Sequence, residues 1–166
     1  MRFADLAAGD SVLMDANTFI YQFSADPVLG PPCNLLLQRI ENQDLTGFTS
    51  VHLLAEVAHK LMTIEANRVL GWPLAGMANR LRRHPAEVQR FSDFRLCIDQ
   101  ITRSLVQLLA VPAWVLVNAT AVSQQTGLLI NDALVVAVMQ ANGLTRLASN
   151  DADFDRVPGL TRDAPV

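Results

Sequence analysis

Length, composition and charge limit the classes of protein to which this chain can belong. At 166 residues, with 51% hydrophobic and only 17% charged residues, it is expected to be a globular protein of one domain rather than a disordered chain. The net charge of −3 argues against nucleic-acid binding by charge alone, because neutralising phosphates needs an excess of cations. That objection weakens if several of the acidic residues bind metal ions.

The cysteines and the chain start give further expectations. Cys33 and Cys97 stand apart from each other and from any histidine, so neither a zinc site nor a disulfide framework is indicated. The segment Met1–Asp10 has no basic region followed by an apolar run, and no stretch is long and apolar enough for a membrane span. We therefore expect a cytoplasmic protein without a membrane partner.

The first half of the chain alternates short apolar runs with longer helical patterns. Ser11–Asp15 predicts a buried strand that ends in an acid. Prolines and glycines at 27–32 predict a break after the first helix. The other elements expected here are helix Asn17–Phe23, helix Cys33–Asn42, strand Leu45–Thr49 and helix Val51–Asn67.

The second half begins at Gly71, Pro73 and Gly76, which predict another break. The elements expected after it are helix Met77–Phe91, helix Phe94–Leu109, strand Trp114–Asn118, helix Leu129–Ala141 and a last strand Thr145–Ser149. Short apolar strands alternating with helices predict an α/β fold, a three-layer α/β/α sandwich around a mostly parallel sheet. We expect a single domain over 1–166, with a helical arm at about 68–95.

Five acidic residues fall at or near strand-to-helix junctions: Asp15, Glu56, Asp132, Asp151 and Asp153. In open parallel sheets the site lies beyond the carboxyl ends of the strands, so one crevice could collect them. Carboxylates about 5 Å apart repel one another by roughly 3 kcal/mol at an effective dielectric near 20. A cation would relieve that repulsion, and all-oxygen ligands suit Mg²⁺ or Mn²⁺. The pattern therefore predicts metal-assisted hydrolysis.

Four segments resemble the motifs of PIN domains, in the order that this family has them. They are MDANTFIYQF at Met14–Phe23, TSVHLLAEVAHKL at Thr49–Leu61, LINDALVVAVMQANGL at Leu129–Leu144 and LASNDADFDRVPGL at Leu147–Leu160. The last, with Asp-x-Asp-Phe and Pro-Gly-Leu, is similar to VapC-type toxins. Ala16 stands where the family commonly has Thr or Ser.

The resemblance implies a metal-dependent endoribonuclease that uses Mg²⁺ or Mn²⁺. Its catalytic acids would be Asp15, Glu56, Asp132 and Asp151, and the metal ligands would be Asp15, Asp132, Asp151 and Asp153. Asn17 and either Thr49 or Ser50 would orient these groups by hydrogen bonds. Resemblance to VapC-type toxins further implies a cognate antitoxin, a toxin–antitoxin system and a homodimer.

Plainer interpretations remain open for several residues. Asp15 and Asp132 could simply cap or stabilise helix N-termini, and Glu56 falls off the apolar stripe assigned to Val51, Ala55, Ala58 and Met62. His52, Glu56 and His59 share a helix face, but their spacing is not that of a zinc protease.

The arginines of the predicted arm also have two interpretations. Arg80, Arg82, Arg83 and Arg90 are by default a solvated helix face, and their functional interpretation is contact with RNA phosphates.

Three other functions stay open at this point. They are an RNA-processing enzyme, a PIN fold that binds without catalysis, and a phosphatase of the haloacid dehalogenase type. The resemblance to the phosphatase motif is weak, because the second acid of that motif is replaced by Asn17 in this sequence.

Overall fold

The computed structural model describes all residues, 1–166. Its strands form one five-stranded sheet, in which every pair of neighbours is parallel and the order is β3-β2-β1-β4-β5. The elements are η1 (Phe3–Asp5), β1 (Ser11–Met14), α1 (Ala16–Phe23), α2 (Gly30–Glu41), β2 (Thr46–Ser50), α3 (Val51–Leu70), α4 (Met77–Arg83), α5 (Pro85–Val88), α6 (Asp93–Arg103), β3 (Gln107–Leu109), α7 (Ala113–Thr126), α8 (Ile130–Ala141), β4 (Arg146–Ala148), η2 (Ala152–Arg156) and β5 (Thr161–Asp163).

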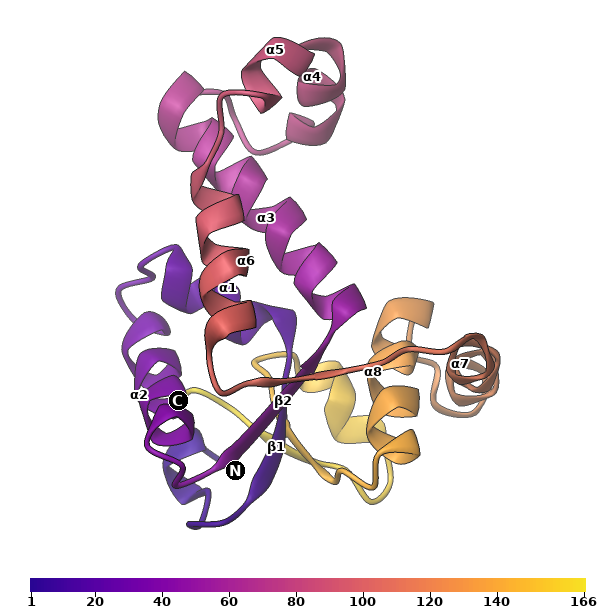
Figure 1. Ribbon diagram of the computed structural model, residues 1–166. Coiled ribbons are helices and arrows are strands. Elements are labelled where there is room, and N and C mark those ends of the chain that lie inside the picture. Colours follow the sequence, from indigo (N-terminus) through magenta and orange to yellow (C-terminus); the bar gives the residue numbers. More distant parts are fainter.

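The predicted α/β/α sandwich is confirmed. Figure 1 shows the strands between α2 on one side and α8 on the other, with α7 outermost beyond α8. The central strand β1 buries Val12, Leu13 and Met14 completely, as expected for a strand covered on both faces. One main core joins the sheet to the helices, from Phe3 to Val157.

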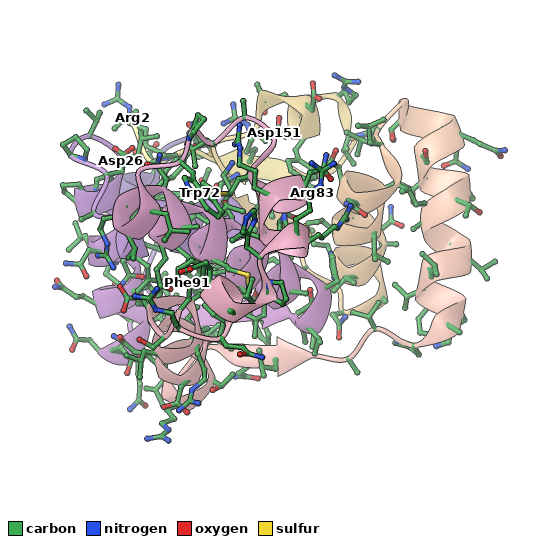
Figure 2. The ribbon with its side chains drawn as sticks, turned by 90° about the horizontal axis from the view of Figure 1, so that it is seen from above. Arg2, Asp26, Trp72, Arg83, Phe91 and Asp151 are labelled. Carbon is green, nitrogen blue, oxygen red and sulfur yellow. The ribbon has the colours of Figure 1, made fainter.

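The arm is a separate projection of the fold. Helix α3 runs away from the sheet and carries α4 and α5 at its far end, and α6 returns along it (Figure 1). A small second core of Ala66, Met77, Leu81 and Phe91 holds this end together. Looked at from above, Arg83 and Phe91 mark the arm and Asp151 marks the loop after β4 (Figure 2). The division into one domain with an arm at about 68–95 stays a prediction.

Two predicted elements of the second half are wrong. Trp114–Asn118 is part of helix α7, where Val115, Ala119 and Val122 are buried at helical spacing; its β-branched residues suggested a strand. The helix expected over Phe94–Leu109 ends at Arg103, and Gln107–Leu109 pairs with β2 as strand β3. In this second case pairing with the sheet overrides the local pattern.

Three other predictions miss boundaries or an element. Pro85 splits the helix expected over Met77–Phe91 into α4 and α5, because proline has no N–H for the helix ladder. Helix α2 begins at Gly30 rather than Cys33, since its prolines occupy the first turn, where helices tolerate them. Thr145–Ser149 is not the last strand, because β5 follows and pairs with β4.

No single helix has both the length and the apolar character of a membrane span. Only α7 and α8 taken together reach them, and that pair is bent by 113°.

Candidate metal and nuclease site

The strand order places the candidate site at the middle of the sheet. From β1 the chain passes to β2 and β3 on one side and later to β4 and β5 on the other. The helices that leave neighbouring strands at such a switch point diverge, which opens a crevice beyond the carboxyl ends of those strands. Here the two strands are β1 and β4. Asp15 directly follows β1, and Ser149 and Asp151 follow β4.

Asp15 is held by hydrogen bonds from three donors. The backbone N–H of Ala16 donates to Oδ1 over 2.7 Å, while Nδ2 of Asn17 and the hydroxyl of Ser149 donate to Oδ2 over 2.5 and 2.6 Å. Asp15 therefore caps the N-terminus of α1, which was the alternative to a catalytic role, but it uses only Oδ1 to do so. The other oxygen accepts from Asn17 in α1 and from Ser149 directly after β4, which fixes the carboxyl group at the switch point.

Burial shifts the protonation of Asp15 strongly. The residue is only 8% exposed, and desolvation raises its pKa from 3.8 to about 6. The hydrogen bonds from Ser149 and Ala16 lower this pKa, whereas the charges of Glu56 and Asp132 raise it. The sequence therefore places a carboxyl group where a negative charge is costly and where a nearby cation would be stabilising.

Three other predicted acids line the same pocket as Asp15. This pocket, which we call the carboxylate pocket, has a volume of about 350 Å³ and includes Glu56, Asp132 and Asp151, with Asn17. Desolvation, then the charges of Asp151 and Asp153, raise the pKa of Asp132. Four acids distant in the sequence are thus brought together.

Glu56 reaches the carboxylate pocket from the exposed side of α3. The predicted apolar stripe of this helix was wrong: Leu53, Leu54, Val57 and Leu61 are buried instead. Partial desolvation of its carboxyl group and then the charge of Asp132 raise the pKa of Glu56, although the residue as a whole is exposed. Its exposure on the helix is therefore compatible with a place in the pocket.

The donor set of the carboxylate pocket suits a hard divalent cation. It offers carboxylate and amide oxygens and no thiol, and such ligands are the ones that Mg²⁺ and Mn²⁺ prefer. No three acidic, histidine or cysteine side chains are already arranged at binding distance of one point. The acids thus share the pocket without converging on one point.

The remaining predicted polar residues lie around the carboxylate pocket. Asp153 is outside it and forms an ion pair with Arg156. Thr49 is buried and donates to the carbonyl of Met14 over 3.2 Å, so it holds the end of β1 rather than a carboxylate. The hydroxyl of Ser50 bonds Nδ1 of His52 at 2.8 Å.

The histidines of α3 do not form a zinc site. His52 is turned to Ser50, and burial lowers the pKa of its imidazole. His59 lines the carboxylate pocket, but His52 does not.

The four arginines predicted to contact RNA have different surroundings. Arg80 donates to the carbonyl oxygens of Pro73 and Ala75, at 2.8 and 2.7 Å, and so holds the loop before α4. Arg90 pairs with Glu87 at 2.9 Å. Arg82 has only the neutral side chain of Asn79 as a partner, at 3.3 Å, and Arg83 has no ion pair. Two of the four are therefore available to a ligand.

Sequence reasoning missed Ser149, Arg162 and Lys60. Ser149 is completely buried and bonds both Asp15 and the backbone N–H of Asp151. Arg162 donates a hydrogen bond to the carbonyl oxygen of Ser149 and one to each carboxylate oxygen of Asp155. Lys60 lines the carboxylate pocket. The position of Ser149 at the end of a predicted strand was the one available signal.

Comparison with protein families decides the assignment. A family model for the PIN domain matches residues 12–160, which include all of the acids discussed above. The chain belongs to the PIN domain family. This membership leaves no support for the phosphatase alternative, and Asn17, at its second motif position, donates to Asp15 instead of acting as an acid. Among curated proteins no sequence matches the chain.

Solved structures show the same PIN fold at low sequence identity. VapBC2 from Rickettsia felis, bound to a DNA fragment from its promoter, has 17% identity and a TM-score of 0.59, with 93% of this chain and 98% of that chain covered. VapC20 from Mycobacterium tuberculosis, a toxin that cleaves the sarcin–ricin loop, has 15% identity and a TM-score of 0.57, with coverage of 87% and 92%. A toxin–antitoxin complex from Klebsiella pneumoniae has 17% identity and a TM-score of 0.53, with coverage of 93% and 98%.

Proposed function

We propose that this PIN protein is a metal-dependent endoribonuclease that hydrolyses phosphodiester bonds of RNA with Mg²⁺ or Mn²⁺. The observation that carries the proposal is the convergence of Asp15, Glu56, Asp132 and Asp151 on one pocket. Membership of the PIN family and the likeness to VapC20 support it. The burial of Asp15 and the raised pKa values of Asp15, Glu56 and Asp132 are otherwise a cost to the fold, and function accounts for that cost.

Each residue has a proposed task. Asp15, Asp132 and Asp151 hold the metal, with Asp153 as a ligand for a second ion after release from Arg156. Glu56 orients or deprotonates the attacking water from the open side of the pocket. A bound Mg²⁺ or Mn²⁺ would lower the pKa of that water and neutralise charge on the phosphate.

Neighbouring groups orient the ligands. Asn17 and Ser149 direct Oδ2 of Asp15, and Thr49 holds the strand end from which Asp15 projects. Such supporting hydrogen bonds commonly change metal affinity or activity 10- to 100-fold.

We further propose that the protein is the toxin of a type II toxin–antitoxin system, acting in the cytoplasm as a homodimer. The likeness to VapBC2 and to the Klebsiella pneumoniae complex supports a cognate antitoxin as partner. An RNA-processing role would use the same chemistry without that partner. Growth arrest on expression, relieved by co-expression of a neighbouring small reading frame, would distinguish the two.

Replacement of one acid tests the nuclease directly. Asp132→Asn should lower the rate of RNA cleavage in Mg²⁺ or Mn²⁺ at least 100-fold, because a ligand charge is lost in a pocket built for a cation. Asp99→Asn is the matched control, since Asp99 pairs with Arg103 on α6 outside the pocket. Cleavage by Asp132→Asn at the rate of the Asp99 variant would refute the assignment, and a binding-only PIN module would show no cleavage by the wild type.

A further inference from the structure

The carboxylate pocket adjoins a second hollow that has the opposite charge. The second hollow, which we call the arm groove, has a volume of about 330 Å³ and lies between α3 and α4. His59 and Lys60 line both spaces. Beyond them the arm groove is lined by Thr63 and by residues of the α3–α4 connection and α4, ending at Arg82. The two hollows therefore meet at His59 and Lys60.

The arm groove is positively charged in a protein whose net charge is −3. Its lining holds Lys60 and Arg82 and no acidic residue. Lys60 is the only lysine of the chain, and neither of these cations forms an ion pair. Elsewhere on the arm Arg68 pairs with Asp93 and Arg90 with Glu87. Both cations that face this groove are thus without an acidic partner.

We infer that the arm groove binds the phosphodiester backbone of the RNA strand that enters the carboxylate pocket. Lys60 contacts a phosphate next to the scissile one, and Arg82 contacts a phosphate farther along the arm. This inference rests on the proposed nuclease function. Of the four arginines that the sequence offered for contact with RNA phosphates it keeps only Arg82, and it adds Lys60. Arg80 is excluded because two carbonyl oxygens engage it.

Electrostatics gives the physical reason for such a groove. An RNA strand that approaches four carboxylates is repelled until metal ions and protein cations offset them. Cations beside the pocket attract the flanking phosphates without competing for the metal ligands. Desolvation and the charge of Asp132 raise the pKa of Glu56, and Lys60, then His59, oppose that rise, which places Lys60 in electrostatic reach of Glu56.

The test measures binding separately from cleavage. Every protein also carries Asp132→Asn, so that a fluorescein-labelled single-stranded RNA stays intact, which a gel of the recovered RNA verifies. Fluorescence anisotropy in Mg²⁺ then gives Kd between 50 and 300 mM KCl for the parent, Lys60→Gln, Arg82→Gln and the double variant. Arg83→Gln is the matched control, because it removes the same charge from α4 at a position outside the arm groove.

The inference predicts that Lys60→Gln and Arg82→Gln each weaken binding roughly tenfold at the lowest salt. The double variant should lower the slope of log K against log salt by about 1.4, at about 0.7 per phosphate contact on a single strand. Arg83→Gln should change Kd less than twofold. Equal Kd values for Arg82→Gln and Arg83→Gln, or tighter binding of a polyglutamate peptide than of RNA, would overturn the groove assignment. RNA cut by the Asp132→Asn parent would instead count against the proposed nuclease site.

Discussion

The hydroxyl of Ser149 donates a 2.6 Å hydrogen bond to Oδ2 of Asp15, across 134 positions of the sequence. The bond joins the carboxyl ends of β1 and β4, the strands that flank the switch point of the sheet. Burial raises the pKa of Asp15, and this bond opposes the rise. Ser149 therefore influences the pH range in which the central carboxylate of the site is charged.

Ser149→Ala should raise the pKa of Asp15 further and weaken activity about tenfold at neutral pH. The acidic limb of the pH–rate profile should move to higher pH, which a merely structural loss would not cause. Thr18→Val is the matched control, because the Thr18 hydroxyl is also buried beside the site but donates to the carbonyl of Ala148. If both variants keep the wild-type acidic limb, Ser149 has only a structural role.

Metal affinity should depend on pH in the range set by Asp15. With a pKa of about 6 in the metal-free protein, Asp15 must lose a proton to bind Mn²⁺ below that pH. The apparent affinity should then fall by about tenfold for each pH unit below 6. Calorimetric titration with Mn²⁺ at pH 5, 6 and 7.5 measures this, and an affinity that stays constant from pH 7.5 to 5 would contradict the assignment.

The same shift makes the metal-free protein less stable at neutral pH. Because the folded pKa of Asp15 lies above its ordinary value of 3.8, its stabilising contribution is complete below about pH 4 and is lost as the pH rises through 6. The loss is roughly 3 kcal/mol. The free energy of unfolding, measured with urea in EDTA, should therefore decline more steeply from pH 4.5 to 7.5 for the wild type than for Asp15→Asn. Parallel plots of unfolding free energy against pH for the two proteins would contradict this contribution of Asp15.

Glu65 links the arm to α6 and should be important for stability. Its carboxylate is 6% exposed and accepts from the backbone N–H groups of Ser92, Asp93 and Phe94, at 2.9, 3.2 and 3.2 Å. Glu65→Ala leaves these three donors without a partner and should cost about 2 kcal/mol of unfolding free energy. Hydrogen exchange should accelerate at the start of α6. Glu65→Gln keeps a hydrogen-bond acceptor and should lose less unfolding free energy than Glu65→Ala. An equal loss in the two variants would contradict the role of Glu65 as acceptor of these N–H groups.

Arg146 should stabilise the end of the sheet opposite the site. It forms two hydrogen bonds with the fully buried Asp163, at 3.1 and 2.7 Å, and pairs with Asp10 at 3.0 Å. Arg146→Met leaves a buried carboxylate uncompensated and should cost about 3–5 kcal/mol. Adding Asp163→Asn should recover part of that loss in urea unfolding. No recovery would show that Arg146 acts mainly by packing.

The part of the fold predicted from sequence is the part dominated by local pattern. The runs around Leu13 and Leu147 are short, apolar and flanked by polar residues, so β1 and β4 are recognisable as buried strands. The edge strand β3 is exposed at Gln107 and Leu108 and has no alternating pattern. It exists because β2 offers a parallel partner, and a single sequence does not display such tertiary pairing.

The site residues likewise divide into those predicted from local sequence and those that depend on tertiary contacts. Asp15 and Asp151 were predicted from their place after strands, and the parallel topology brings them to one pocket. Ser149 and Lys60 were missed because their importance depends on which strand and which helix face adjoin Asp15. Glu56 was doubtful because its helix was given the wrong buried face. With Leu53 and Val57 as buried residues, Glu56 is exposed on α3 and lines the carboxylate pocket.

Direct detection of Mn²⁺ in the carboxylate pocket tests the central claim best. Electron paramagnetic resonance at pH 7.5 counts free Mn²⁺ as the protein is titrated, for the wild type, Asp132→Asn and the control Asp99→Asn. We expect one or two bound ions in the wild type and the control, and an affinity at least tenfold weaker in Asp132→Asn. Unchanged binding in Asp132→Asn, or no binding by the wild type, would contradict a metal site built from these acids.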